Sequence, residues 1–418
     1  MTRPGAFLTV ALIALLHAFS HAYGVMLVPL YLHITRDLHL PGVKSAALVV
    51  AVYGAVYFLL SYPAGILADR HNRRNLLALG LLGNAAAIVL MGLTARYSML
   101  LMLAAAAGMF GTLFHPAANA LAPAHMPRSP GMALGLIGIG SGIGFFAGSQ
   151  YSGWCAEHAV HNWGGLLRWQ IPCVDLGLAG LVFGALFLAV AREAPHVEQT
   201  GTRPAVALGP GMRRRTLAVA IVSACRDFAG VGAMSLLSIY LQKARGFDAA
   251  YTGWLLGAMG LVSIAATPLG LWLTAGRRRL PGLALTKILG GLTLALIPLA
   301  PAALLLPALT VFQAFHLGSY AISEVALVER VDPDARGRVV GLYLTVAGTL
   351  GACSPWVVGA WTDLLGKSAA HNSAYIPLFA ALAALMAVAA AAVRPISRLG
   401  ARRQAAPARL PPAGAGEI

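Results

Sequence analysis

The chain has 418 residues, of which 58% are hydrophobic and 11% are charged, and its formal net charge is +16. This composition is too apolar for a water-soluble domain and indicates a protein that lies in the lipid bilayer. The positive charge is spread over many loops, as expected beside an anionic lipid leaflet, so we do not expect a nucleic-acid partner.

Apolar runs long enough to cross a membrane recur along the whole chain. A spanning helix needs about 20 apolar residues, and twelve runs qualify: 6–32, 45–67, 75–94, 98–122, 131–153, 171–191, 216–241, 250–275, 281–299, 303–328, 338–361 and 374–393. The first run is too long for a signal peptide, so we predict an uncleaved helix. The sequence predicts an all-α, polytopic membrane protein with twelve transmembrane helices.

Basic residues gather in the loops on the side of both termini, for example in 70–74 and 277–279. Because such loops stay in the cytoplasm, we expect both termini to be cytoplasmic, in the inner membrane of a bacterium. A hydrophilic stretch divides the chain. The predicted domains are an N-terminal six-helix bundle (1–191), a cytoplasmic linker (192–215), a C-terminal six-helix bundle (216–393) and a disordered cytoplasmic tail (394–418).

The segment 63–74 recurs in weaker form at 268–279. Four residues of the first copy meet identical residues in the second at one constant offset: Pro63, Gly65, Arg73 and Arg74 fall on Pro268, Gly270, Arg278 and Arg279. The two bundles are therefore predicted to be pseudo-symmetric parallel repeats, with a binding site between them near the middle of the membrane.

The first copy, with Gly65, Asp69, Arg70, Arg73 and Arg74, resembles the signature loop of the major facilitator superfamily. The twelve-helix plan matches that family over almost the whole chain. The resemblance implies a secondary transporter rather than an enzyme, working by alternating access on a small-molecule substrate, as a monomer and without a cofactor other than a coupling proton. Two residues depart from the pattern: Asn72 stands where Gly is usual, and Thr274 replaces the acid in the second copy.

We expect this loop to act as a conformational latch made of Gly65, Asp69, Arg70, Arg73, Arg74 and Arg338. Gly65 should allow close helix approach, and the arginines should bind the carbonyls that end the second helix. Asp69 should engage the latch arginines and the start of the eleventh helix, near Arg338, in one conformation only. The alternative is a solvated turn without such a role.

Helices 1, 4 and 5 resemble the branch of fosmidomycin-resistance-type exporters, through His17 with His21, His115 with Pro116, and a glycine-rich fifth helix. This resemblance implies proton-coupled export of a drug-like or anionic metabolite. Exchangers of the family usually have Pro where this chain has Ser149, followed by Gln150. Uptake by proton symport, or a sensor that moves no solute, are the alternatives.

Ionisable groups inside a membrane usually face a cavity or a partner. Aligning Tyr31 with Tyr240 places His17 opposite Arg226 in the repeat, so we expect both to border a central cavity. Arg226 is predicted to attract an anion and Asp227 to carry protons. The alternative is that these neighbours form a structural pair.

His17 and His21 lie four residues apart, hence on one helix face. They are predicted to contact substrate or protons, the alternative being that they only tie helices together. His115 with Asn119 is a further candidate for the same pathway, the alternative being a packing role. Weaker candidates are Gln150, Gln313, His316 and Glu324. Glu157, His158 and His161 form an acid-and-imidazole group in an outer loop, but we expect no metal site. A phosphate-binding Gly-Lys loop is missing, so ATP-driven transport is not expected.

Overall fold

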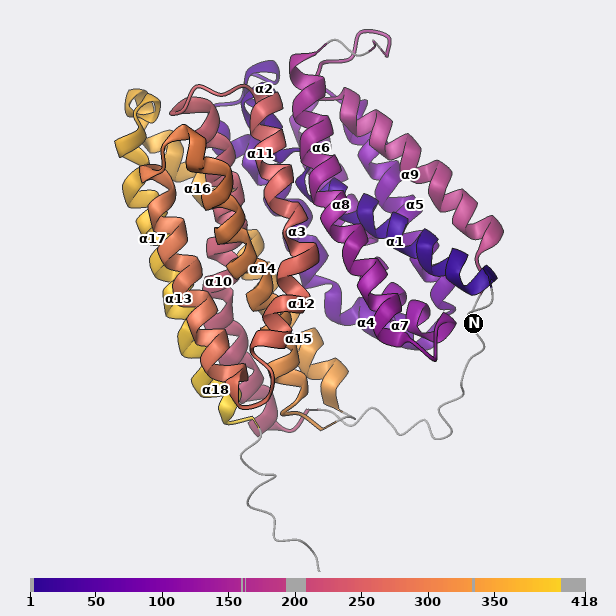
Figure 1. The fold of residues 1–418 in the computed structure, drawn as a ribbon. Coiled ribbons are helices and arrows are strands. Elements are labelled where there is room, and N and C mark those ends of the chain that lie inside the picture. Colours follow the sequence, from indigo (N-terminus) through magenta and orange to yellow (C-terminus); the bar gives the residue numbers. More distant parts are fainter. Residues whose placement is uncertain (1–3, 159–160, 162, 193–207, 333–334, 400–418) are drawn as a thin grey trace, which may run out of the picture.

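The computed structural model describes residues 4–158, 161, 163–192, 208–332 and 335–399. Within these residues the chain is helical and contains no strand. Figure 1 shows two groups of helices lying side by side, the first from the N-terminal part of the chain and the second from the C-terminal part. The predicted linker and tail fall largely outside the described residues.

The described part of the N-terminal half contains nine α-helices: α1 (Pro4–Val25), α2 (Tyr31–Asp37), α3 (Val43–Leu59), α4 (Ser61–Arg70), α5 (Arg73–Gly92), α6 (Tyr97–Gly111), α7 (Phe114–His125), α8 (Pro130–Glu157) and α9 (Ile171–Val190). A short 3₁₀ turn, Val28–Leu30, joins α1 to α2. Asn72, the departure from the family pattern, caps α5, because its side-chain oxygen accepts a hydrogen bond from the backbone N–H of Asn75.

The C-terminal half follows the same plan: α10 (Pro210–Lys243), α11 (Ala249–Leu261), α12 (Ser263–Leu273), α13 (Arg279–Leu296), α14 (Leu305–Val328), α15 (Arg336–Ala352), α16 (Ser354–Leu364), α17 (Ile376–Val388) and α18 (Val393–Ser397). Helix α10 begins at Pro210, so the second half starts inside the stretch predicted as linker.

The described residues provide 11 helices long and apolar enough to cross a membrane, or 12 when the pair α3 and α4, bent by 47°, counts as one span. The predicted twelve spans are confirmed on that count. The bend, at Leu60, lies three residues before Pro63, which has no backbone N–H to donate and whose ring clashes with the preceding turn. Breaks just before Pro116 and Pro355 have the same cause.

Helix α8 packs closely against both halves of the molecule. A Cβ atom added to Gly140 or Gly144 would lie 2.1 or 2.2 Å from a backbone oxygen of α1. One added to Gly153 would lie 2.2 Å from the carbonyl oxygen of Ala249, at the start of α11. The glycines of α8 thus serve helix contact, which is the packing role that the spacing of four residues indicates.

Hydrogen bonds join the two halves at the end of the bundle where α1 ends, and we call this group the clamp. The Tyr31 hydroxyl lies 3.0 Å from the Ser235 hydroxyl of α10. One turn later, the Ser238 hydroxyl donates to the carbonyl oxygen of Val28 at 2.6 Å. These contacts fix the end of the first span to the matching end of the seventh.

The clamp also contains two carboxylates that bind backbone across the halves. Asp363 of α16 accepts hydrogen bonds from the N–H groups of Val43 and Lys44, at the start of α3, at 2.9 and 3.1 Å. Glu157 of α8 accepts one from the N–H of Ala249, the first residue of α11, at 3.0 Å. Each half therefore supplies an acid that caps a helix of the other half.

Candidate functional site

The first polar cluster lies inside the N-terminal half and consists of His17, His21, His115 and Tyr57. His17 and His21 come from α1, and their Nε2 atoms are 3.0 Å apart. The Nε2 atom of His115, from α7, is also 3.0 Å from that of His17. The Tyr57 hydroxyl of α3 lies 2.6 Å from Nδ1 of His115. The structure thus brings together three predicted site residues from distant parts of the sequence.

Aromatic rings and one backbone carbonyl hold these imidazoles in place. The ring of Phe114 stacks on His17, and Phe145 lies against His21, with ring centroids 5.5 and 4.6 Å apart. Nδ1 of His17 lies 2.7 Å from the carbonyl oxygen of Ile137 in α8. His17 is 6% exposed, whereas His21 and His115 are half-buried. The cluster therefore ties α1, α7 and α8 together while one side of it remains accessible.

The second polar cluster, in the C-terminal half, centres on Arg226 of α10. Its Nε donates to Oδ1 of Asp227 at 2.6 Å, and its Nη2 lies 2.5 Å from the same oxygen. Nη2 also donates to the Tyr343 hydroxyl of α15 at 3.0 Å. Nη1 is 3.2 Å from both the backbone oxygen of Ser319 and the hydroxyl of Ser323 on α14. Every nitrogen of the guanidinium has a protein acceptor.

Arg226 does not border an open cavity, so that expectation is wrong for this conformation. Its side chain is 0% exposed, and the ring of Tyr320 covers it, with the guanidinium carbon 3.6 Å from the ring centroid. The physical reason is that α14 and α15 present enough acceptors to satisfy the charge inside the protein. The structural pair with Asp227, considered above as the alternative, describes this geometry.

Two further ionisable groups lie in the C-terminal half. Glu324 is half-buried on α14, next to Ser323, and makes no hydrogen bond or ion pair with a described residue. Lys287 of α13, which the sequence analysis missed, is 1% exposed and its Nζ donates to the carbonyl oxygen of Ala389 at 3.1 Å. A lone lysine within an apolar run was the signal that identifies it.

The remaining pathway candidates do not join either cluster. Asn119 is exposed on α7. Gln150 lines a groove with Tyr151 and Leu176, and its Oε1 has no hydrogen-bond partner within the described residues. Gln313 is 4% exposed, and its Oε1 is also unpartnered there. Their role in a pathway stays a prediction.

The predicted latch is only partly assembled. Arg73 lies 3.4 Å from the carbonyl oxygen of Ala68, at the end of α4, as expected. Arg74 instead binds the end of α9, through the carbonyl oxygens of Leu188 and Ala191. A Cβ atom at Gly65 would meet nothing within 4 Å, so the expected close helix approach there is wrong for this conformation.

Asp69 is exposed, as is Arg70 beside it, and Asp69 forms no hydrogen bond or ion pair with any described residue. Its predicted partner Arg338 is half-buried in the first turn of α15, a helix that packs against α4. In the second repeat Thr274 takes the place of Asp69 and accepts a hydrogen bond from Arg279 at 3.3 Å. Arg279 also pairs with Glu329 at 3.0 Å.

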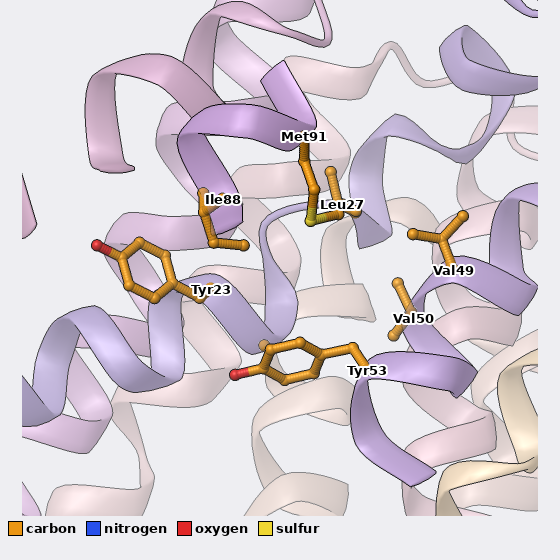
Figure 2. A pocket seen from close by; sticks show the side chains of 8 residues that line it. Tyr23, Leu27, Val49, Val50, Tyr53, Ile88 and Met91 are labelled. Atoms are coloured by element: carbon orange, nitrogen blue, oxygen red, sulfur yellow. The ribbon is translucent and has the colours of Figure 1, made fainter. Parts of the chain in front are cut away.

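The outer-loop group of Glu157, His158 and His161 does not form one cluster. His161 lies 3.1 Å from Asp175, whereas Glu157 serves the clamp. Figure 2 shows a separate small cavity inside the N-terminal half, where Tyr23, Val49, Tyr53, Ile88 and Met91 surround the space. Its volume of about 10 Å³ is close to the smallest that holds a water molecule, so it cannot hold a solute.

The molecule consists of two similar halves of membrane-spanning helices, which are joined by the clamp at one end. Each half holds a polar cluster between its apolar helices. This architecture is that of a membrane transporter. The sequence profile of the Major Facilitator Superfamily matches residues 10–355 and 219–414. The chain belongs to this superfamily, and it is a transporter, not an enzyme.

Several relatives in this superfamily are multidrug resistance proteins. The chain is 24% identical over 317 residues to the multidrug resistance protein MdtH of Shigella dysenteriae, covering 73% of this chain and 74% of the relative. It is 33% identical over 159 residues to MdtG of Escherichia fergusonii, covering 37% and 36%.

Solved structures confirm the fold over the whole chain. One is the structure of a bacterial homologue of the human lysosomal transporter Spinster in an inward-facing, occupied conformation. It matches with a TM-score of 0.80 at 16% identity, covering 99% of this chain and 100% of the other. The nucleoside transporter NupG matches with a TM-score of 0.72 at 14% identity, covering 92% and 99%. At these identities the comparison concerns the fold alone.

Proposed function

We propose that the protein exports a small drug-like or anionic solute in exchange for protons, by alternating access in the inner membrane of a bacterium. Both termini lie in the cytoplasm in this proposal, because the basic loops gather on their side of the bundle. The single observation that carries it is the clamp, which joins the halves at one end of the bundle. The multidrug relatives support export and a drug-like solute.

The clamp lies at the end opposite the basic loops, so the proposal assigns it to the periplasmic side and the conformation to the inward-facing state. Alternating access then requires the clamp to open while contacts form at the other end. Asp69 supports this scheme, because it is exposed here and stands on a helix that packs against α15. Its pairing near Arg338 belongs to the outward-facing state.

Proton coupling is assigned to the carboxylates of the C-terminal half. Asp227 forms a buried ion pair with Arg226. The pair can separate only when a proton neutralises Asp227 or an anionic solute takes its place beside Arg226. Glu324 is half-buried and unpartnered within the described residues, one residue from the Ser323 hydroxyl that binds Arg226. Glu324 is therefore the better placed of the two to exchange protons with solvent.

The direction of transport is tested in everted membrane vesicles with an acidified lumen. Antibiotics and dyes that raise the melting temperature of the purified protein are added to the outer medium. Proton exchange predicts substrate-evoked alkalinisation of the lumen, and Glu324→Gln should abolish it while preserving the thermal shift. Asp37→Asn, which changes a carboxylate paired with the adjacent Arg36, serves as the matched control.

Proton symport in the uptake direction is the second candidate, favoured by Ser149 at the position where exchangers of the family usually have Pro. It predicts no alkalinisation in the same vesicles, together with solute flux in liposomes that a proton gradient accelerates. A sensor without transport predicts a thermal shift but no flux. Either result would overturn the export proposal.

A further inference from the structure

The histidine cluster of the N-terminal half has the arrangement of a metal site. One atom from each of His17, His21 and His115 can be chosen so that all three lie within 4.8 Å of one another, and the Nε2 contacts of His17 with the other two are 3.0 Å. Imidazole nitrogens bound to a tetrahedral ion at 2.0–2.1 Å lie about 3.3 Å apart. The two distances from His17 are within a few tenths of an ångström of that spacing.

The groups behind the imidazoles orient them as metal ligands. A carbonyl oxygen only accepts, so the bond to Ile137 places the proton of neutral His17 on Nδ1 and leaves the Nε2 lone pair directed into the cluster. The Tyr57 hydroxyl can accept the same kind of bond from Nδ1 of His115. Outer partners of this kind fix the ring orientation of histidine ligands in metal sites.

Without a cation, the Nε2 atoms of the cluster cannot all form good hydrogen bonds with one another. Both His21 and His115 direct Nε2 at the single Nε2 lone pair of His17, which can accept only one good hydrogen bond. A cation at the centre would use all three lone pairs. Among the described residues of the C-terminal half there is no equivalent set, because Arg226 stands opposite His17 in the repeat.

We propose that His17, His21 and His115 bind one transition-metal dication of the Zn²⁺ class through their Nε2 atoms. Three neutral imidazoles suit Zn²⁺, Co²⁺ or Ni²⁺, whereas Mg²⁺ and Ca²⁺ require oxygen ligands. Because His21 and His115 are only half-buried, a fourth coordination position on the metal is open to water or a polar solute. This site holds a metal whether or not the export proposal is correct.

The test uses the purified full-length chain in lipid nanodiscs, without a polyhistidine tag, titrated with Co²⁺ and then Zn²⁺. We expect one Co²⁺ per chain with the visible absorption of four-coordinate cobalt, and its displacement by Zn²⁺. His115→Gln should remove the visible bands and the stoichiometric site. His125→Gln, which changes a histidine on the same helix α7 that lies outside the cluster, should keep both.

Tyr57→Phe is a second variant that keeps all three ligands and removes only the outer partner of His115. It should weaken Zn²⁺ binding about 10- to 100-fold. The proposal is overturned if the wild type shows no four-coordinate cobalt spectrum, or if His115→Gln and His125→Gln bind the metal equally. Should His115→Gln fail to fold, an unchanged Zn²⁺ affinity in Tyr57→Phe would overturn it instead.

Discussion

The polar clusters of the two halves occupy matching positions of the repeat but differ in chemistry. With Tyr31 aligned on Tyr240, His17 meets Arg226 and His21 meets Gly230. The pair Phe114-His115 recurs as Phe315-His316. One framework of helices therefore presents three imidazoles in the first half, and an arginine, a glycine and one imidazole in the second.

The missing side chain at Gly230 accounts for much of this difference. A Cβ atom there would lie 1.8 Å from Cε1 of His316, so that ring occupies the space that His21 fills in the other half. His316 is 5% exposed, and its Nδ1 has no hydrogen-bond partner within the described residues. The comparison teaches that the C-terminal cluster is closed in this conformation and held by a buried ion pair, whereas the N-terminal cluster is half-buried and open on one side.

The largest expected effect is on the C-terminal anchor. Asp227→Asn leaves the buried guanidinium of Arg226 without its counter-ion, and breaking a buried pair in this way costs about 3 to 5 kcal/mol. The free energy of unfolding, measured by denaturant titration in mixed micelles, should fall by that amount. Replacing both residues, as Arg226→Met with Asp227→Leu, should restore most of it. A loss below about 1 kcal/mol for Asp227→Asn would contradict the anchor role.

A smaller effect on the free energy of unfolding is expected from filling the space beside Gly230. Gly230→Ala forces a methyl group against the His316 ring and should cost about 1 to 3 kcal/mol through overpacking. Adding His316→Ala should relieve the clash, so a double-mutant cycle would show strong coupling between the two sites. Gly24→Ala on α1 is the matched control, because its Cβ would meet only Tyr53, at 3.8 Å. Additive effects at positions 230 and 316 would refute the explanation.

His17→Gln in the N-terminal cluster should alter stability less, by up to about 1.5 kcal/mol, because only neutral hydrogen bonds are lost. Transport of any identified solute should nevertheless fall. Unfolding titrations and flux assays on the same preparation separate the two effects. A stability loss as large as that of Asp227→Asn would show that both clusters are anchors.

The smallest effect on stability concerns the latch copies. Asp69→Asn changes an exposed side chain and should shift the unfolding free energy by no more than about 0.5 kcal/mol. The transport rate should drop if Asp69 pairs in the outward-facing state, whereas Thr274→Ser, which keeps the hydroxyl group, should leave it unchanged. An unaltered rate in Asp69→Asn would favour the solvated turn.

Much of the fold could be predicted from sequence because its signals are local or repeated. Apolar runs define the spans, prolines such as Pro63 define the breaks, and the recurrence of 63–74 defines the two halves. The partners of Arg226 could not be predicted, since Tyr320 and Tyr343 come from helices about a hundred residues away and resemble ordinary core aromatics. The convergence of His115 on His17 was likewise hidden, because shared depth in a membrane does not fix which helix faces which.

The clamp role of Asp363 and Glu157 was missed for a related reason: both look like ordinary charges near helix ends. Because each caps a helix of the opposite half, separating the halves there strips acceptors from two helices at once. Hydrogen bonds to charged groups contribute about 1.5 to 3 kcal/mol each. A solute that drives the opposite conformation must bind that conformation more favourably by at least the sum of these free energies, minus the free energy recovered when water hydrates the separated groups. A compound whose affinities for the two conformations differ by less would leave the equilibrium of the empty transporter nearly unchanged, so this difference in affinity is a condition for transport.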